Sequence, residues 1–265
     1  MMPIENVTTI ERDWNRLYNE FPERYDEFAE AQDPTDTMAH VSGHVDLAGK
    51  VVLDIGGGSG KYARCLAPEA ALVHCLDPCL PLIEVAERRA RELGATNIVT
   101  GQAEAQKVPL GDATVDVVLA AHSISAIAAR DFSTPGHASA DVSESRFAER
   151  ALAVTELLRV LRPGGWLFSL TPAPDNYGGE LSEIVLGADG AEWSRGKLRF
   201  IRWMSDEFGF VSTPIRADWK FPDGDEAARV FGFVYGAEAA DFLRQHDVRT
   251  IENRLVIQTL RKPRS

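Results

Sequence analysis

Apolar residues recur at spacings of three and four near the start of the chain, between residues 10 and 31. Positions with this spacing share one face of a helix, so the pattern predicts one or two amphipathic helices, bent near Pro22. The apolar positions are Trp14, Leu17, Tyr18, Phe21, Tyr25 and Phe28. Many positions between them are acidic, and we expect that face to meet water. The apolar face is expected to pack on the main domain or on a second copy of the chain.

From residue 50 to residue 170, short apolar runs alternate with amphipathic runs. Continuous apolar runs are typical of strands that a parallel sheet buries on both faces. The segments 82–94 and 146–161 have helical periodicity, and Gly94 stands where a helix would end. Strands are expected at 51–55, 71–77, 97–101, 115–122 and 166–170. The alternation predicts an α/β fold with a doubly wound, mostly parallel sheet.

The last third of the chain has a different pattern, because 11 of the 22 aromatic residues fall between 172 and 235. Strands are expected at 211–221 and 253–262, with one helix at 225–246 between them. These strands would bring the sheet to seven, with an antiparallel edge. The predicted parts are an N-terminal helical cover (1–45), a central core (46–171), an inserted cap (172–210) and a C-terminal completion of the sheet (211–265).

The composition narrows the class of protein. A chain of 265 residues, 45% of them hydrophobic, can bury a sizeable core. Its net charge of −12 argues against a protein that mainly grips nucleic acid phosphates. Three cysteines are too few for a disulfide framework, and no apolar run is long enough for a membrane span. The N-terminal residues lack the features of a signal peptide, so we expect a cytoplasmic protein without membrane or nucleic acid partners.

The segment VVLDIGGGSG, residues 51–60, places an acid and four glycines at the end of the first expected strand. Open α/β sheets bind ligands at the carboxyl ends of their strands, so this turn is the expected nucleotide site. It is not a Walker loop, because no Gly-Lys-Ser/Thr follows. Residues 58–63 match G-x-G-x-x-A, which leaves a nicotinamide cofactor as an alternative. However, Asp54 stands where dinucleotide turns normally hold an apolar residue. Asp77, which ends the second strand, suits the ribose of either cofactor.

The stretches DIGGGSG, HCLDP, GQAEAQKVPLGDATVDVVLA and ELLRVLRPGGWLF occur in this order between residues 48 and 172. In order and spacing they resemble the successive motifs of class I S-adenosylmethionine-dependent methyltransferases, of the small-molecule type-11 kind. The resemblance implies a Rossmann-like, cofactor-binding core. It also implies S-adenosylmethionine as the cofactor, S-adenosylhomocysteine as the product, and no metal.

The resemblance further implies cofactor contacts at the ends of successive strands. By position these are Tyr25, Asp54, Gly56, Gly58, Asp77, Pro78, Gln102, Ala103, Glu104, Ala120 and His122. Asp54 and the two glycines would hold the methionine part, and Asp77 would bind the ribose. Gln102 replaces the family's acid, so its amide oxygen would have to accept from the adenine amine. Tyr25 lies in an element that covers the cofactor in relatives, and its ring would attract the sulfonium.

Methyl transfer from a sulfonium is an in-line displacement, in which the protein mainly aligns the acceptor and excludes water. A general base is needed only if the acceptor holds a proton at neutral pH. His122 is the best-placed candidate for a catalytic base, ahead of His44 and His137, but a pocket histidine without that role fits too. Lys61 and Arg64 are expected to be solvated residues of a helix.

The acceptor pocket is expected between the N-terminal cover, the loop 123–145 and the aromatic segment 172–205. An aromatic lining suits a flat or apolar small molecule, as found in secondary metabolism. We therefore expect a small-molecule methyltransferase, with O-methylation slightly favoured over N- or C-methylation. An RNA or protein methyltransferase, and a non-catalytic cofactor-binding protein of the same fold, are the alternatives. A homodimer is compatible with the apolar N-terminal face.

Overall fold

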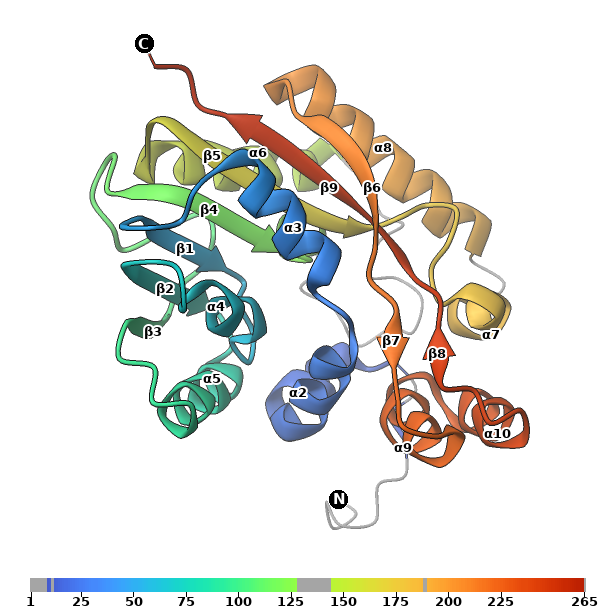
Figure 1. The fold of residues 1–265 in the computed structure, drawn as a ribbon. Helices are drawn as coiled ribbons and strands as arrows, with labels where there is room; N and C mark the ends of the chain where they lie inside the picture. Colours follow the sequence, from blue (N-terminus) through green and yellow to red (C-terminus); the bar gives the residue numbers. More distant parts are fainter. Residues whose placement is uncertain (1–8, 11, 128–143, 188–189, 265) are drawn as a thin grey trace.

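The computed structural model describes residues 9–10, 12–127, 144–187 and 190–264. Within them, a seven-stranded sheet has the order β3-β2-β1-β4-β5-β9-β6 (Figure 1). The strands are β1 (Val51–Ile55), β2 (Leu72–Asp77), β3 (Ile98–Gln102), β4 (Val115–Ala121), β5 (Leu161–Pro172), β6 (Val211–Arg216) and β9 (Arg254–Arg261). Strands β1 to β5 pair in parallel. The predicted α/β fold, with a doubly wound and mostly parallel seven-stranded sheet, is confirmed.

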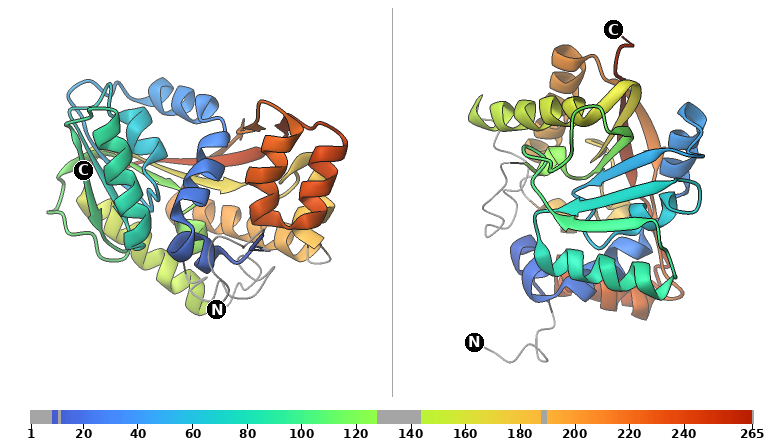
Figure 2. Two further views of the ribbon diagram at one scale, coloured as in Figure 1. Left: turned by 90° about the horizontal axis from the view of Figure 1, so that it is seen from below. Right: turned by 90° about the vertical axis from the view of Figure 1, so that its left-hand side faces the viewer.

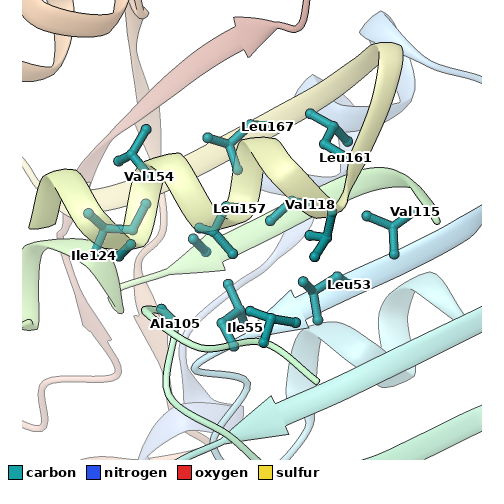
Figure 3. Packing of buried hydrophobic residues seen from close by; sticks show 14 of the residues in the cluster. Leu53, Ile55, Ala105, Val115, Val118, Ile124, Val154, Leu157, Leu161 and Leu167 are labelled. Carbon is teal, nitrogen blue, oxygen red and sulfur yellow. The ribbon is translucent and has the colours of Figure 1, made fainter. Parts of the chain in front are cut away.

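Helices cover both faces of this sheet. On one face lie α3 (Thr35–His44), α4 (Lys61–Leu66) and α5 (Leu80–Glu92), and Leu66 of α4 packs in a cluster with Val52 and Val73. On the other face lie α6 (Glu144–Val160) and α8 (Gly190–Phe208). Figure 3 shows α6 placing Val154 and Leu157 over Val118 of β4 and Leu167 of β5. The central strands β1 and β4 are largely buried on both faces, which explains their continuous apolar sequences.

The C-terminal part of the sheet differs from the expectation. The antiparallel strand is β9, which pairs with both β5 and β6, so it lies inside the sheet and β6 forms the edge. The expected strand 211–221 is two strands, because β7 (Trp219–Lys220) leaves the sheet and pairs with β8 (Thr250–Ile251). The expected helix 225–246 is also divided, into α9 (Gly224–Tyr235) and α10 (Ala237–Gln245). Gly236 separates them with a φ of 103°, which helical residues do not adopt.

A second apolar cluster lies beyond the sheet and joins the two ends of the chain. It unites α1 (Trp14–Glu20) and α2 (Pro22–Ala31) with α7 (Ser182–Leu186), α9 and α10. Figure 2 shows the N-terminal helices beside the α9–α10 pair. The predicted N-terminal helices therefore exist, with Pro22 at the start of α2, but much of their apolar face packs on α9.

The segment expected as an inserted cap does two things. Its main helix, α8, buries Phe200 and Met204 in the core beneath the sheet. The first half of the same helix brings Trp193 and Lys197 to the cavity described below. The segment is thus partly a cover of the sheet. The division of the chain into four parts stays a prediction.

Candidate functional site

A cavity of about 230 Å³ opens at the carboxyl ends of β1 and β4, between the glycine turn and the second apolar cluster. Its lining includes Tyr25, Asp54, Gly56, Gly57, Lys61, Ala121, His122, Ser125, Tyr177, Trp193, Lys197, Trp219 and Tyr235. Four of the residues expected at the cofactor, Tyr25, Asp54, Gly56 and His122, therefore line one cavity. Ala120 does not, because its side chain is buried in the core between the sheet and α6.

The glycine turn approaches its neighbours too closely for side chains. Gly56 has a φ of 69°, and a Cβ on it would lie 2.3 Å from the Cβ of Ser123. Gly58 has a φ of 55°, and a Cβ there would lie 3.0 Å from a ring carbon of Tyr25. Both positions need the left-handed backbone that glycine adopts without strain. The ring of Tyr25 thus lies directly against the turn.

Asp54 is fully buried at the end of β1 and faces the cavity. Neither of its carboxyl oxygens has a hydrogen-bond partner among the described residues. Burial raises the pKa of this carboxyl to about 7, against a smaller opposing effect of the Ala63 amide, which lies outside full hydrogen-bond geometry. A buried polar group without a partner is costly. Its position is therefore explained best by a ligand that donates hydrogen bonds to it.

Asp77 ends β2 and holds the glycine turn in place. Its carboxylate accepts hydrogen bonds from the amides of Gly58, at 2.9 Å, and Cys79, at 2.8 Å. Burial raises the pKa of Asp77, and these two amide hydrogen bonds oppose the rise. A carboxylate has about four acceptor positions, so Asp77 keeps capacity for further donors.

The residues expected around an adenine lie at the ends of β2 and β3, outside the cavity. The Gln102 amide nitrogen donates to the carbonyl of Pro78 at 2.8 Å. The Ala103 amide donates to the carbonyl of Asp77 at 3.1 Å. Glu104 lies at the surface, where its backbone forms an isolated antiparallel β-bridge with Lys107. The structure thus places these residues next to Asp77, beside the glycine-turn end of the site.

His122 follows β4 directly and is partly buried. Burial, followed by the charges of Lys197 and Lys61, lowers the pKa of its ring to about 4. At neutral pH the ring is therefore uncharged and only weakly basic. Its φ of 57° is unusual for a residue with a side chain, and such strained positions cluster at functional sites. Of the weaker histidine candidates, His44 packs against Trp166 on the sheet, and His137 lies outside the described residues.

Aromatic rings form the wall opposite the glycine turn. Phe28 and Trp219 have ring centroids 5.4 Å apart, and Tyr177 and Trp193 are 5.3 Å apart. The hydroxyls of Tyr177 and Tyr235 lie 2.5 Å apart in a hydrogen bond. Trp219 and Tyr235 come from β7 and α9, outside the segment 172–205 where the sequence placed the aromatic lining. Of the expected loop 123–145, only residues 123–127 and 144–145 are described.

The cations in the cavity were not expected from the sequence. Lys61 is buried, and its ammonium donates to the carbonyls of Ala29, at 2.6 Å, and Gln32. Arg64 is also largely buried, beside Asp26 and Glu30, so the prediction that both side chains are solvated is wrong. The reason is that α2 packs over α4, which periodicity within α4 does not reveal.

Two further cations reach the cavity from distant parts of the chain. Arg12 donates to the carbonyl of Val185 at 2.7 Å. Lys197 of α8 is buried, and burial, followed by the charge of Arg150, lowers the pKa of its ammonium to about 7. The spacing of Lys197 and Trp193 by four positions was a signal that both share one helix face.

In the described ranges, no group of three or more His, Cys, Asp or Glu side chains is arranged to hold a metal ion. Each described helix is too short or too polar to span a bilayer.

Comparison with known proteins finds a family match over the segment that contains the glycine turn. Residues 53–169 match the model of a family described as a methyltransferase domain. An uncharacterised methyltransferase of Mycobacterium tuberculosis is 30% identical over 145 residues, which make up 54% of this chain and 49% of that protein. A ubiquinone/menaquinone biosynthesis C-methyltransferase of Saccharophagus degradans is 30% identical over 128 residues, 46% of this chain and 43% of that protein. This chain spans about half the length of the curated relatives it matches.

Solved structures agree with the fold. A SAM-dependent methyltransferase from Aquifex aeolicus aligns with 88% of this chain and 97% of its own, with a TM-score of 0.51 and 17% identity. At that identity the likeness supports the arrangement of helices and strands alone.

Proposed function

We propose that this chain, whose residues 53–169 form a methyltransferase domain of the class I S-adenosylmethionine-dependent family, methylates a small aromatic molecule. For residues 53–169, the family match agrees with the family and the cofactor expected from the sequence. The proposal rests on one observation above all. The same strand end carries an unpartnered buried carboxyl, Asp54, and opens into a cavity walled by aromatic rings.

The glycine-turn end fits the cofactor's charges. The oxygens of Asp54 would accept hydrogen bonds from the ammonium of the methionine part, and that positive charge would favour the ionised carboxylate. Asp77 would accept from the ribose hydroxyls with its remaining capacity. Tyr25, whose ring lies against Gly58, is the aromatic group we assign to the sulfonium. When bound, the cofactor supplies an activated methyl group, which bonds to the acceptor as the S–CH₃ bond breaks and its electron pair stays on sulfur.

The aromatic end fits a planar acceptor of small size. Rings such as Trp193 and Trp219 offer flat apolar surface, and closing the site around an acceptor would exclude water. Positioning of this kind supplies roughly 7–11 kcal/mol of a displacement barrier. We keep O-methylation as the proposed outcome. The relative named as a C-methyltransferase is the reason that any product must be tested for both linkages.

Cofactor binding is tested first, by thermal unfolding of the intact chain with S-adenosylhomocysteine and, separately, with NAD. A ligand that binds only the native state at a hundredfold excess over its Kd adds about 2.7 kcal/mol of stability, which is roughly 5–10 °C for a chain of this size. We expect a saturable rise with S-adenosylhomocysteine alone. A rise with NAD alone, or none with either ligand, would contradict the proposal.

Turnover is tested next, with S-adenosylmethionine and a panel of planar phenols, amines and carbon nucleophiles. Mass spectrometry of the products would show a gain of one methyl group, and fragmentation would distinguish methyl on oxygen from methyl on carbon. We expect methyl ethers from the phenols. Transfer to RNA or protein but to none of the small molecules would contradict the proposed acceptor class while leaving the cofactor assignment intact.

A further inference from the structure

Lys197 is a buried cation that faces the cavity and has no polar partner among the described residues. Its side chain is 7% exposed, and its Nζ lies 5.6 Å from the centre of the Trp193 ring. Within the described part of the chain, no hydrogen bond or ion pair reaches this ammonium. Burying a charged group without such partners is costly. A structural lysine would normally be paired, so this position points to a group that enters the cavity.

The other cations near the cavity are already engaged. Lys61 donates hydrogen bonds to two carbonyls at the end of α2, and Arg12 donates to the carbonyl of Val185. Arg150 of α6 donates to the carbonyl of Ser125 at 3.0 Å and lies over the Phe200 ring. Each of these three ties one segment of the site to another. Lys197 has no such task in the described structure.

The acidic lining of the cavity lies at the end opposite to Lys197. Among the described residues that line the cavity, Asp54 is the only acid, and it lies on the glycine turn against Gly57. The charged and titratable groups that act on Lys197 are instead Arg150 from α6 and His122 after β4. The aromatic end is therefore a flat, electropositive compartment. It is suited to a planar molecule that carries, or can acquire, a negative charge.

We propose that Lys197 takes the proton of an acidic hydroxyl, a phenol or enol on a planar acceptor, and then pairs with the oxyanion that forms. This inference rests on the proposed function and specifies its acceptor class and its base. In the proton step the O–H bond breaks, its electron pair stays on oxygen, and an N–H bond forms on the neutral amine of Lys197. The resulting oxyanion is the nucleophile for the methyl group.

The electrostatic surroundings support this role for Lys197 over His122. Burial and Arg150 bring the pKa of Lys197 to about 7, so a large fraction is a neutral amine at neutral pH. A base with a pKa near the working pH is the most effective, because it is both available and strong enough. His122 has a pKa of about 4 and would hold the proton too weakly. Because the His122 ring is neutral, it adds no further positive charge to the compartment.

The test uses p-nitrophenol, whose ionised form absorbs in the visible, and p-nitroaniline, a probe of the same shape without an acidic hydroxyl. Both are titrated into the intact protein at a pH where p-nitrophenol is mostly protonated in buffer, with and without S-adenosylhomocysteine. Wild-type protein is expected to bind p-nitrophenol and raise its phenolate absorbance. The Lys197→Met variant should bind it at least ~10-fold more weakly and without that rise, because a charge-assisted hydrogen bond is lost.

Two controls make the result specific. Arg199→Met removes an exposed cation two positions away on the same helix and should leave both titrations unchanged. Neither substitution should alter p-nitroaniline binding. Methionine replaces a buried charge with an apolar chain of similar length, and a melting curve confirms that Lys197→Met is folded. Lys197→Gln is a second variant with the same expected loss.

Three outcomes would overturn the inference: an equal phenolate signal in wild type and Lys197→Met, binding of p-nitrophenol to wild type without ionisation, or no binding of p-nitrophenol to wild type. Failure of S-adenosylhomocysteine to bind would count against the proposed function instead. The titrations without it would still decide the role of Lys197, so the two failures are distinguishable.

Discussion

The two ends of the cavity differ in both charge and origin. At the glycine-turn end, the groups that face a ligand are carboxylates and backbone amides from one short stretch, residues 54–77, with the Tyr25 ring above them. At the aromatic end, they are rings and cations brought together from Arg12, Tyr177, Lys197, Trp219 and Tyr235. The first end depends on local backbone geometry, whereas the second depends on packing between distant segments.

Under the proposed function, this difference separates recognition of a cofactor from recognition of an acceptor. A positively charged nucleoside fits the glycine-turn end, which is acidic. A planar molecule that becomes negatively charged fits the aromatic end, which is basic. The family model covers residues 53–169, so it includes the glycine turn but none of Tyr177, Lys197, Trp219 and Tyr235. The end that lies outside the matched domain is the one that would set acceptor specificity.

The largest expected effect is on folding, at the aromatic end. Trp219 is 2% exposed and packs against Phe28, Phe231 and Tyr177 at centroid distances of 5.4, 5.2 and 5.9 Å. Trp219→Ala should lower the free energy of unfolding by about 3–5 kcal/mol, because it leaves a cavity among three packed elements. Urea unfolding measures this change. A loss below about 1 kcal/mol would show that the aromatic end does not depend on this packing.

A comparable effect is expected from Asp54, and it depends on pH. The folded protein keeps a proton on this carboxyl up to about pH 7, whereas an unfolded aspartic acid, with an ordinary pKa of 3.8, loses it near that pH. Between these values the folded state binds more protons, so stability falls as the pH rises. Asp54→Asn removes this contribution, and its stability relative to wild type should rise by up to about 4 kcal/mol from pH 4 to pH 7.

Urea unfolding without cofactor, at several pH values, measures this difference. Other titrating groups in the cavity, such as Lys61 and Lys197, are common to both proteins, so they cancel in the comparison. Stability that varies with pH in parallel for wild type and variant would mean that Asp54 has a partner in solution. The glycine-turn end would then have no unpaired carboxyl at Asp54 to receive a ligand.

A smaller effect, on cofactor affinity, is expected from Asp77. Asp77→Ala removes the acceptor of the Gly58 amide and the proposed ribose ligand. Hydrogen bonds to a charged group contribute about 1.5–3 kcal/mol each, so the Kd for S-adenosylhomocysteine should rise by roughly 100-fold or more. Calorimetric titration measures it, with Asp206→Ala on the exposed face of α8 as the matched control. Unchanged affinity would remove Asp77 from the cofactor site.

The smallest effect tests whether the Tyr25 ring, at the boundary between the two ends, attracts the positive charge of the sulfonium. Tyr25→Ala should weaken S-adenosylmethionine more than S-adenosylhomocysteine, by about 2- to 30-fold, because only the former carries a sulfonium for cation–π attraction. Tyr25→Phe keeps the ring and should retain the difference. If alanine weakens both ligands equally, Tyr25 acts through shape alone.

Much of the fold and of the acidic end could be predicted from the sequence. Strand and helix periods are local, so the alternation from 51 to 170 predicted the sheet and its helices. The backbone of the glycine turn is equally local, because the acid and the glycines that allow a left-handed backbone are encoded within VVLDIGGGSG. The groups that approach the turn, Ser123 and Tyr25, come from distant parts of the chain. The divided C-terminal elements were less clear, since the break at Gly236 and the pairing of β7 with β8 depend on contacts far along the chain.

Only the tertiary structure shows which cations and rings gather in the cavity, and how far burial changes their pKa values. Lys61 and Lys197 both resemble solvated residues in a helix, and their burial follows from which segments pack over them. His122 is a plausible base from its position after a strand, but its pKa depends on burial and on two lysines that are distant in sequence. The sequence by itself determined the cofactor turn because its geometry is local. The acceptor compartment arises from long-range packing, and so it became visible only in the folded chain.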